Sequence, residues 1–400
     1  MAKSKQPKII VPSSQSQQMM IAAGMSKEQR DASVAAVQSG IIADMGPGSV
    51  MTLNEVGGVQ DLPFLISTGS LAIDISLGLL WKKDGIWWHG LAPGRQIEIF
   101  GAEHSGKTTL ALQIVKNGQR HPVAKILDTA YLDSEHALDR DYAGKLRVDL
   151  SKMKYISVGA AEEYLEALLR LIKTRLFSVI VVDSIAALIT KTELAGSEAM
   201  GQLARLLSNK LREISQEVVK SPTVVIYVNQ LRSLINVPGN TTPGGRALRF
   251  YSSVRLSCAR GDYIPVSSSD PARAGQYLNT ETVKNKLAPP YKKAESPLYF
   301  GQGTDPIFDM VRLCCDYQVF TTTGAWLAHP CGLKANGKGQ AADLLRAYKR
   351  DWYPTLKDEL LTKVMKLRGQ NPDGSYIPGF VPVAQTLVDE EEEALVETEI

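Results

Sequence analysis

Cysteines and long apolar runs are scarce in this 400-residue chain, and their scarcity excludes several classes of protein. The four cysteines, Cys258, Cys314, Cys315 and Cys331, show neither zinc-site nor redox-motif spacing. We therefore expect reduced thiols and a cytoplasmic protein. No apolar run approaches the roughly 20 residues of a membrane-spanning helix, and no signal-peptide core follows the first lysines.

Acidic residues are fewer than basic ones outside the end of the chain. Residues 389–400 hold seven acids and no bases; without them, 35 acidic residues face 45 basic ones, a net charge of +10. A basic body with an acidic tail indicates a polyanionic partner, for which the tail competes. A tail that only keeps the protein soluble fits the same charges equally well.

The composition, 44% hydrophobic and 22% charged, is that of a globular protein with one main domain and smaller additions. We expect a polar, disordered extension at 1–16, a helical segment at 17–63 and the main domain at 64–322. A small basic domain at 323–384 and an acidic disordered tail at 385–400 complete the chain.

Strand and helix patterns alternate between residues 94 and 317. Apolar, β-branched runs at 178–183 and 223–229 are typical of strands buried on both faces. Apolar residues at helical spacing mark amphipathic helices at 161–177 and 201–220. The alternation predicts an α/β fold: a mostly parallel sheet flanked by helices, with a helical N-terminal segment and a small C-terminal α/β domain.

A glycine-rich loop follows the short strand predicted at 96–100. The sequence GAEHSGKT at 101–108 fits the Walker A pattern, in which backbone N–H groups and a helix N-terminus bind phosphate. We expect Lys107 to reach the β- and γ-phosphates and the Thr108 hydroxyl to bind Mg²⁺. The predicted ATP-binding residues are Gly101, Ala102, Glu103, His104, Ser105, Gly106, Lys107, Thr108 and Thr109.

Carboxylates that follow two other predicted strands suit the same chemistry. Asp183 ends the run 178–183 and fits a Mg²⁺ ligand, although an aspartate there is often only a helix cap. Hydrolysis needs a group that activates water, and the spacing does not choose between Asp133 and Glu135. His136 fits a packed or capping histidine better than a base.

An ordered set of motifs resembles the bacterial RecA family. The motifs lie at 66–78, 101–108, 133–139, 180–188, 228–232, 244–251 and 283–288, the last followed by Pro289. The likeness covers about residues 46–339, and the ordered set is specific to this family. It implies a RecA-type P-loop core that uses ATP and Mg²⁺ and polymerises on single-stranded DNA as a helical filament, with 17–63 serving polymerisation. It also implies DNA-stimulated ATP hydrolysis and strand exchange with homologous duplex DNA.

The resemblance assigns roles at the nucleotide site. Glu135 corresponds to the water-activating glutamate, and Gln230 to the residue that senses the γ-phosphate and signals to a DNA-binding loop. Asp139 and Tyr142 correspond to positions beside the adenine. Lys284 and Lys286 correspond to lysines that reach the ATP of the neighbouring subunit. These cationic lysines stabilise the transferring phosphoryl group, so hydrolysis is expected to require a filament.

Two loops, 190–201 and 231–245, are expected to bind DNA on the same basis. Met200 corresponds to a residue that wedges between base triplets, whereas an isolated methionine would more often be core. Glycine N–H groups and arginines bind phosphates without sequence preference. The implied DNA contacts are Met200, Arg205, Ser208, Arg212, Arg232, Ile235, Gly244, Gly245, Arg246 and Arg260.

The chain departs from the family at the second DNA site, which holds the incoming duplex. Arg260 is retained, but Ala259, Asn279 and Glu281 stand where basic residues are usual in the family. Arg273 is a candidate to compensate for these three missing basic side chains. An insertion at 79–91 holds three of the five tryptophans and favours core packing or a subunit contact. A divergent branch, with a phage-encoded protein in a host cytoplasm as one hypothesis, fits these departures.

Two other function classes share such a core. A ring-forming, helicase-type motor is one, and Met200 together with Lys284 and Lys286 argues against it. A non-catalytic DNA-coating or regulatory protein is the other. Proteins that load the filament or bind single-stranded DNA are expected as further partners, and a membrane is not.

Overall fold

The computed structural model describes residues 25–46, 49–51, 61–196, 201–233, 240–266 and 270–378. The chain divides into two compact units, Met1–Gly58 and Val59–Ile400. The expected extension at 1–16 and the acidic tail at 385–400 lie outside the described residues.

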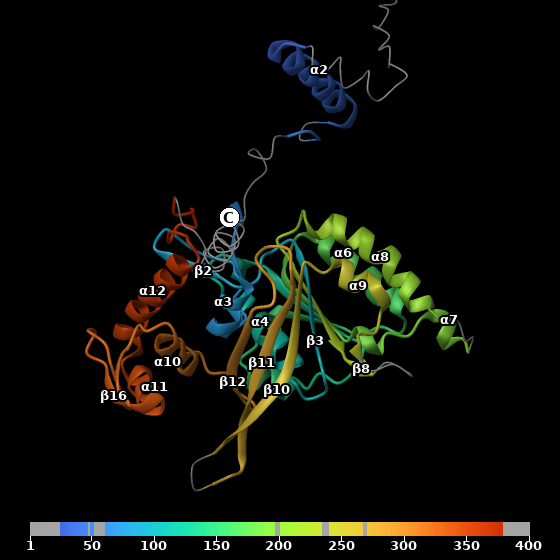
Figure 1. Cartoon of the computed structure of the whole chain (residues 1–400). Coiled ribbons are helices and arrows are strands. Elements are labelled where there is room, and N and C mark those ends of the chain that lie inside the picture. Colours follow the sequence, from blue (N-terminus) through green and yellow to red (C-terminus); the bar gives the residue numbers. More distant parts are fainter. Residues whose placement is uncertain are drawn as a thin grey trace, which may run out of the picture. The chain divides into compact units, whose positions relative to one another are not determined.

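The first unit contains the helix α2 (Lys27–Met45), drawn in blue in Figure 1. Ser26 and Gln29 form a capping box: the Ser26 hydroxyl accepts from the N–H of Gln29, whose side chain accepts from the N–H of Ser26. None of the helix residues is buried. One helix thus lies in the described part of the segment that the sequence predicts to be helical.

A nine-stranded sheet forms the centre of the second unit, in the order β13-β12-β11-β10-β3-β7-β6-β4-β5. Every neighbouring pair from β10 to β5 is parallel, and β11, β12 and β13 add antiparallel strands. This sheet confirms the predicted fold class. The strands are β3 (Arg95–Gly101), β4 (Asp128–Asp133), β5 (Met153–Ile156), β6 (Phe177–Asp183), β7 (Val224–Gln230), β10 (Val254–Pro265), β11 (Arg273–Asn285), β12 (Lys293–Tyr299) and β13 (Gly303–Thr304).

Helices cover both faces of the sheet (Figure 1). On one face lies α4 (Lys107–Arg120), and on the other lie α6 (Ala161–Thr174) and α8 (Gln202–Val218). The shorter elements are α3 (Leu71–Leu77), α5 (Arg140–Lys145), α7 (Lys191–Leu194), α9 (Gly245–Tyr251), α10 (Pro306–Asp316), the 3₁₀ turns η2 (Ala124–Ile126), η3 (Leu150–Lys152) and η4 (Ile185–Ala187), and the pair β8 (Arg232–Ser233) and β9 (Asn240–Thr241).

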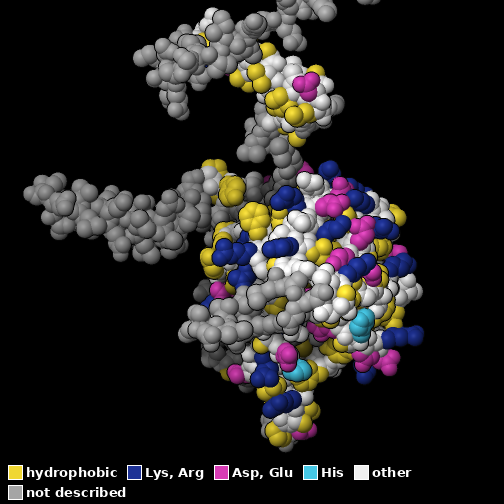
Figure 2. Space-filling model, turned by 90° about the vertical axis from the view of Figure 1, so that its right-hand side faces the viewer, with side chains coloured by type: hydrophobic (Ala, Val, Ile, Leu, Met, Phe, Trp, Pro, Cys, Tyr) yellow, Lys and Arg dark blue, Asp and Glu magenta, His cyan; other side chains and the backbone are white. Residues whose placement is uncertain are grey.

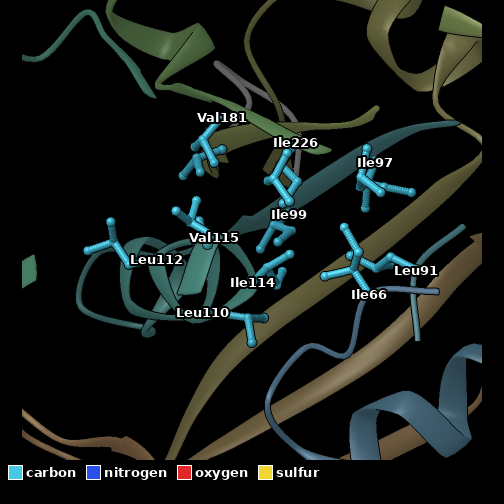
Figure 3. Packing of buried hydrophobic residues seen from close by; sticks show 14 of the residues in the cluster. Ile66, Leu91, Ile97, Ile99, Leu110, Leu112, Ile114, Val115, Val181 and Ile226 are labelled. Carbon is cyan, nitrogen blue, oxygen red and sulfur yellow. The ribbon is translucent and has the colours of Figure 1, made fainter. Parts of the chain in front are cut away.

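The central strands β6 and β7 are mostly apolar because both of their faces are covered. Figure 3 shows one face, where Ile99 and Ile226 lie beside Ile114 of α4, all at most 1% exposed. The alternate residues of the same strands, such as Val182 and Val225, belong to the cluster that packs on α6 and α8. Successive side chains of a strand point to opposite faces, so a continuous apolar run fills both layers.

The tryptophan-rich insertion forms a hairpin of β1 (Leu80–Lys83) and β2 (Ile86–His89). Trp81 is 4% exposed and belongs to a small apolar cluster with Leu65, Leu79 and Ala92. Its role is therefore core packing, which the sequence favours over stacking on a nucleotide.

The C-terminal region combines a three-stranded sheet with two helices. The strands are β14 (Thr321–Thr323), β15 (Trp326–Ala328) and β16 (Lys334–Asn336), and the helices α11 (Gly337–Ala347) and α12 (Lys349–Leu367). One apolar cluster joins α11 and α12 to α3 and α10, and Trp87 Nε1 of β2 donates to Asp358 of α12 over 2.8 Å. None of the helices in the described ranges is long and apolar enough to cross a membrane.

Candidate active site

The glycine-rich loop at 101–108 connects the end of β3 to the start of α4. Gly106 caps α4 with φ of 90°, a conformation that glycine adopts without strain. At Gly101 a Cβ atom would lie 2.0 Å from the carbonyl oxygen of Cys258 in β10, so no side chain fits. The two glycines thus allow the loop to bring backbone N–H groups and the N-terminus of α4 to the sheet edge, where they can bind an anion.

Lys107 is buried at the base of this loop. Its ammonium donates to the Ala102 carbonyl over 2.5 Å and to the Ser105 hydroxyl over 3.4 Å. Burial lowers the pKa of Lys107, and the nearby carboxylates of Asp183 and Glu135 act against this shift. A phosphate beside the ammonium would favour its charged form in the same way, because an opposite charge raises the pKa of a lysine.

Thr108 and Asp183 place two oxygen atoms together beside the loop. Thr108 Oγ1 and the Tyr131 hydroxyl donate to Asp183 Oδ2 over 2.8 and 2.6 Å. Burial raises the pKa of Asp183, and these two hydrogen bonds oppose that shift. Mg²⁺ usually takes one or two protein oxygens and completes its shell with phosphate and water, so this pair fits a magnesium ion that binds with a nucleotide. The described residues contain no cluster of three or more His, Cys, Asp or Glu that would hold a metal alone.

Glu135 lies where the ends of three neighbouring strands meet. Its Oε1 accepts from the Ser184 hydroxyl, next to the end of β6, over 2.5 Å. The same oxygen accepts from Gln230 Nε2, at the end of β7, over 3.2 Å. The structure therefore brings together the two residues that the sequence proposes as water activator and γ-phosphate sensor.

Asp133, the alternative water activator, has a different environment. It is 2% exposed, and its carboxylate accepts from the N–H groups of Glu135 and Leu138 and from the Tyr155 hydroxyl. Glu135 is exposed. The geometry favours Glu135 for contact with water, because Asp133 already holds the turn after β4. His136 is exposed, and its Nδ1 lies 2.9 Å from the Ser157 hydroxyl, so it is not the packed histidine that the sequence favours.

A cavity of about 540 Å³ adjoins the loop, with Thr108, Thr109, Tyr142 and Phe300 in its wall. Thr109 Oγ1 and the Tyr142 hydroxyl lie 2.6 Å apart. Asp139 caps α5 by accepting from the N–H groups of Asp141 and Tyr142 over 2.7 and 3.1 Å, which fixes Tyr142 beside the cavity. The rings of Tyr142 and Phe300 offer flat apolar surface to a nucleotide base.

Lys284 and Lys286 lie on β11 and just after it, beside α9. Lys284 Nζ donates to the carbonyls of Arg249 and Phe250 over 2.6 and 2.9 Å, where the end of a helix attracts cations. Lys286 Nζ lies 5.8 Å from the centre of the Phe250 ring. Burial, followed by the charges of Lys286 and Arg255, lowers the pKa of Lys284 to about 8.

The candidate DNA contacts gather on α8 and the start of α9. Arg205, Ser208 and Arg212 are exposed at helical spacing on α8. Gly245, which precedes the exposed Arg246, packs so closely that a Cβ atom would lie 3.0 Å from the Cβ of Ala204 in α8. Gly244, the cap of α9, has φ of 89°. The side of the molecule with α7 and α8 shows Lys and Arg next to acidic side chains (Figure 2). Met200 and Ile235 lie outside the described residues, and of Arg232 only the backbone in β8 is described.

Comparison with known proteins decides the family. A family profile described as the RecA N-terminal domain matches residues 32–305. The RecA proteins of Thermus aquaticus and Aquifex aeolicus are both 39% identical to the chain, over 81% and 83% of it and 90% and 91% of their own lengths. The RecA protein of Laribacter hongkongensis is 35% identical over 92% of the chain and 99% of its own length. The chain belongs to the RecA family.

A crystal structure of the RadB recombinase is also similar, with a TM-score of 0.44 and 22% identity over 60% of this chain and 98% of that one. Membership of the RecA family makes the chain an ATP-dependent recombinase, whose enzymatic activity is DNA-dependent ATP hydrolysis with strand exchange. These relatives do not favour the helicase-type alternative.

The hairpin of β10 and β11 carries the positions at which the sequence is expected to depart from the family at the second DNA site. Ala259 pairs with Asn279, and both line a hollow with Glu281 and Lys293. Arg260 instead lines the cavity beside the phosphate loop. Arg260 therefore does not share a surface with Ala259, Asn279 and Glu281.

Sequence reasoning missed several residues of the site. Ser184 directly follows Asp183 in the sequence, and this adjacency is the signal that could have identified it as a site residue. Phe300 lies in a Tyr-Phe-Gly turn after β12, where an exposed aromatic residue is a weak signal. Gln276 donates to the carbonyl of His104 in the phosphate loop over 2.9 Å. No local pattern marks Gln276, because its position depends on how β10 and β11 pair.

Proposed function

We propose that ATP binds at the 101–108 loop between two copies of this chain and that its γ-phosphate controls the affinity of the filament for single-stranded DNA. Lys107 holds the phosphates, and Thr108 and Asp183 hold Mg²⁺, which neutralises phosphate charge. Glu135 orients and deprotonates the attacking water. Asp139 and Tyr142 lie beside the base.

The observation that supports this proposal best is the shared oxygen of Glu135. Gln230 donates to it over 3.2 Å, and Gln230 directly precedes the loop at 231–245. A γ-phosphate beside Glu135 competes for the Gln230 amide and so changes the end of β7. This gives ATP a differential contact with two states of the DNA-binding loop, which a nucleotide switch requires.

Single-stranded DNA is proposed to lie over α8 and the start of α9, held through its phosphates by Arg205, Ser208, Arg212, Gly244, Gly245 and Arg246. Met200, Arg232 and Ile235 are proposed as further contacts to the same strand, and homologous duplex DNA is the second substrate. Binding through the backbone is independent of sequence and weakens with salt, as a recombinase requires.

Lys284 and Lys286 are proposed to reach the ATP held by the neighbouring copy. Their charge then stabilises the transferring phosphoryl group only after assembly, which limits hydrolysis to the filament. A cytoplasmic location and partners that load the filament or coat single-stranded DNA belong to the same proposal.

The test is the Glu135→Gln variant, with His136→Ala as a matched control in the same turn. We expect DNA-stimulated phosphate release to fall by about 10²-fold or more in Glu135→Gln, while electron microscopy still shows ATP-dependent filaments. The control should keep most of its activity. Loss of DNA binding by a folded Glu135→Gln protein, or closed rings in place of filaments, would contradict the proposal.

A further inference from the structure

Two of the three β-bulges between β10 and β11 give the hairpin an unusual face. Arg260 pairs with Leu278 and Tyr263 with Gln276, so β10 holds one extra residue between these pairs. Ile264 pairs with Gly275 and Pro265 with Arg273, so β11 holds one extra residue in turn. A bulge re-aims the side chains that follow it.

The bulges place four side chains on one face of the hairpin. Arg260 and Tyr263, like Arg273 and Gln276, are three residues apart, a spacing that puts side chains on opposite faces of a regular strand. With one extra residue in each interval, they return to the same face, and all four line the 540 Å³ cavity beside the phosphate loop.

The guanidinium groups are held on an aromatic ring at this face. The Arg273 guanidinium carbon lies 3.7 Å from the centre of the Tyr263 ring, and that of Arg260 lies 5.3 Å from it. Both arginines are exposed, and neither forms an ion pair with a carboxylate in the described ranges. Among the described residues that line the cavity, no carboxylate neutralises these two cations.

The hairpin is fixed to the phosphate loop itself. Gln276 Nε2 donates to the His104 carbonyl over 2.9 Å, and a Cβ atom on Gly106 would lie 3.1 Å from Leu298 Cδ1 of β12. Lys107, Thr108 and Thr109 line the same cavity as the two arginines. A nucleotide seated on the loop therefore lies under the arginine-bearing face.

We propose that Arg273, stacked on Tyr263 and supported by Arg260, is a second cationic contact for the phosphates of the bound nucleotide, on the side of the cavity opposite the loop. This inference rests on the proposed nucleotide site and adds a residue to it. A guanidinium binds phosphate through two parallel N–H donors. Stacking on Tyr263 restricts the side chain beforehand, which reduces the entropy lost on binding.

The same contact links the nucleotide to the hairpin. Ala259, Asn279 and Glu281 line a separate hollow, which neither Arg260 nor Arg273 lines. Arg273 is thus better placed to bind nucleotide than to add a positive charge to that hollow. In this chain the hairpin acts as a clamp on the nucleotide.

The experiment measures ADP and non-hydrolysable ATP analogue binding by calorimetry, without DNA, for wild type, Arg273→Ala, Arg273→Lys, Tyr263→Phe and Tyr263→Leu. We expect dissociation constants about tenfold higher for Arg273→Ala, since one charged hydrogen-bonding group is lost. Arg273→Lys keeps the charge but not the paired donors, so its dissociation constant should lie between those of the wild type and Arg273→Ala. Tyr263→Phe should bind as wild type does, and Tyr263→Leu should weaken binding.

The control is Arg170→Ala, which removes an exposed arginine of α6 that contacts Glu166. Its nucleotide affinity should equal that of the wild type. Wild-type affinity in Arg273→Ala overturns the inference, and it assigns Arg273 to a DNA surface if duplex binding falls at the same time. If the wild-type protein itself binds neither nucleotide, the proposed function fails, so the two failures are distinct.

Discussion

Gln230 donates its side-chain amide to the Glu135 carboxylate over 3.2 Å, which joins the ends of β7 and β4 across β6. Next to Gln230, Asn229 Nδ2 donates to Glu98 over 2.9 Å and to the Pro243 carbonyl over 3.1 Å. The strand that leads to the proposed DNA loop is therefore attached at its end both to Glu135, the proposed water activator, and to Pro243 near the far end of that loop. A change at the γ-phosphate has a short path to the DNA surface.

Replacing Gln230 by Ala should separate nucleotide binding from DNA stimulation. Lys107, Thr108 and Asp183 are untouched, so ADP affinity should stay within about twofold, as for a site that keeps its charged contacts. Stimulation of ATP hydrolysis by single-stranded DNA should fall by about tenfold or more, since the amide no longer reports on the phosphate. Phosphate release with and without DNA measures the effect, and full stimulation would remove Gln230 from the path.

The low pKa of Lys284, about 8, predicts that ATP-dependent assembly is sensitive to mild alkali. Below that pH the ammonium is charged and can bind the neighbouring ATP; as the pH rises through about 8, the free chain loses this proton. Phosphate stabilises the charged form, so assembly takes up a proton and weakens above pH 8. Lys284→Arg should lose this dependence in light-scattering titrations from pH 7 to 9. An unchanged profile would exclude Lys284 as its source.

The same shift has an opposite effect on the isolated fold. Between the folded pKa of Lys284, about 8, and the ordinary lysine value of 10.5, the unfolded chain binds more protons than the folded one. The contribution of Lys284 to stability therefore increases with pH in that window. Melting curves of the monomers at pH 7.5 and 9.5 measure this. The stability of the wild type relative to Lys284→Met should be greater at pH 9.5 than at pH 7.5.

The buried ion pair between Glu98 and Arg255 predicts a large loss of stability on one-sided substitution. Glu98 is fully buried and Arg255 is 14% exposed. Replacing Arg255 by Met leaves a carboxylate without its partner, which should cost about 3–5 kcal/mol in denaturant unfolding. Lys154→Met, which breaks the exposed pair with Asp128, should cost no more than about 1 kcal/mol. Equal losses would contradict the burial argument.

Trp81→Ala should destabilise the fold without changing nucleotide binding. The side chain is 4% exposed in its apolar cluster, so its removal should cost about 3–5 kcal/mol. ADP affinity, measured well below the melting transition, should equal that of the wild type because the ring lies outside the 540 Å³ cavity wall. Weaker ADP binding in the folded variant would favour the nucleotide-stacking interpretation.

The sequence predicts those parts of the fold and the site in which local pattern and motif order coincide. The runs at 178–183 and 223–229 are strands within one residue at their ends, because β-branched residues without polar interruption must be covered on both faces. The residue spacing alone does not choose between Asp133 and Glu135 as the water activator, and the family resemblance was needed. The structure supplies a physical reason, because the Asp133 carboxylate already accepts hydrogen bonds from backbone N–H groups. The face of the hairpin that Arg260 and Tyr263 share could not be predicted, because it depends on a β-bulge that no residue pattern indicates.

The central claim is that each nucleotide site is completed by a second copy of the chain, and mixing two inactive variants tests it most directly. Glu135→Gln lacks the water activator, and the Lys284→Ala, Lys286→Ala double variant lacks the cations for its neighbour. In mixed filaments, verified by energy transfer between labelled subunits, about a quarter of the head-to-tail interfaces join two intact halves. We predict that a one-to-one mixture recovers DNA-dependent ATP hydrolysis to about a quarter of the wild-type rate. A mixture no more active than its two components, in verified mixed filaments, would contradict the claim.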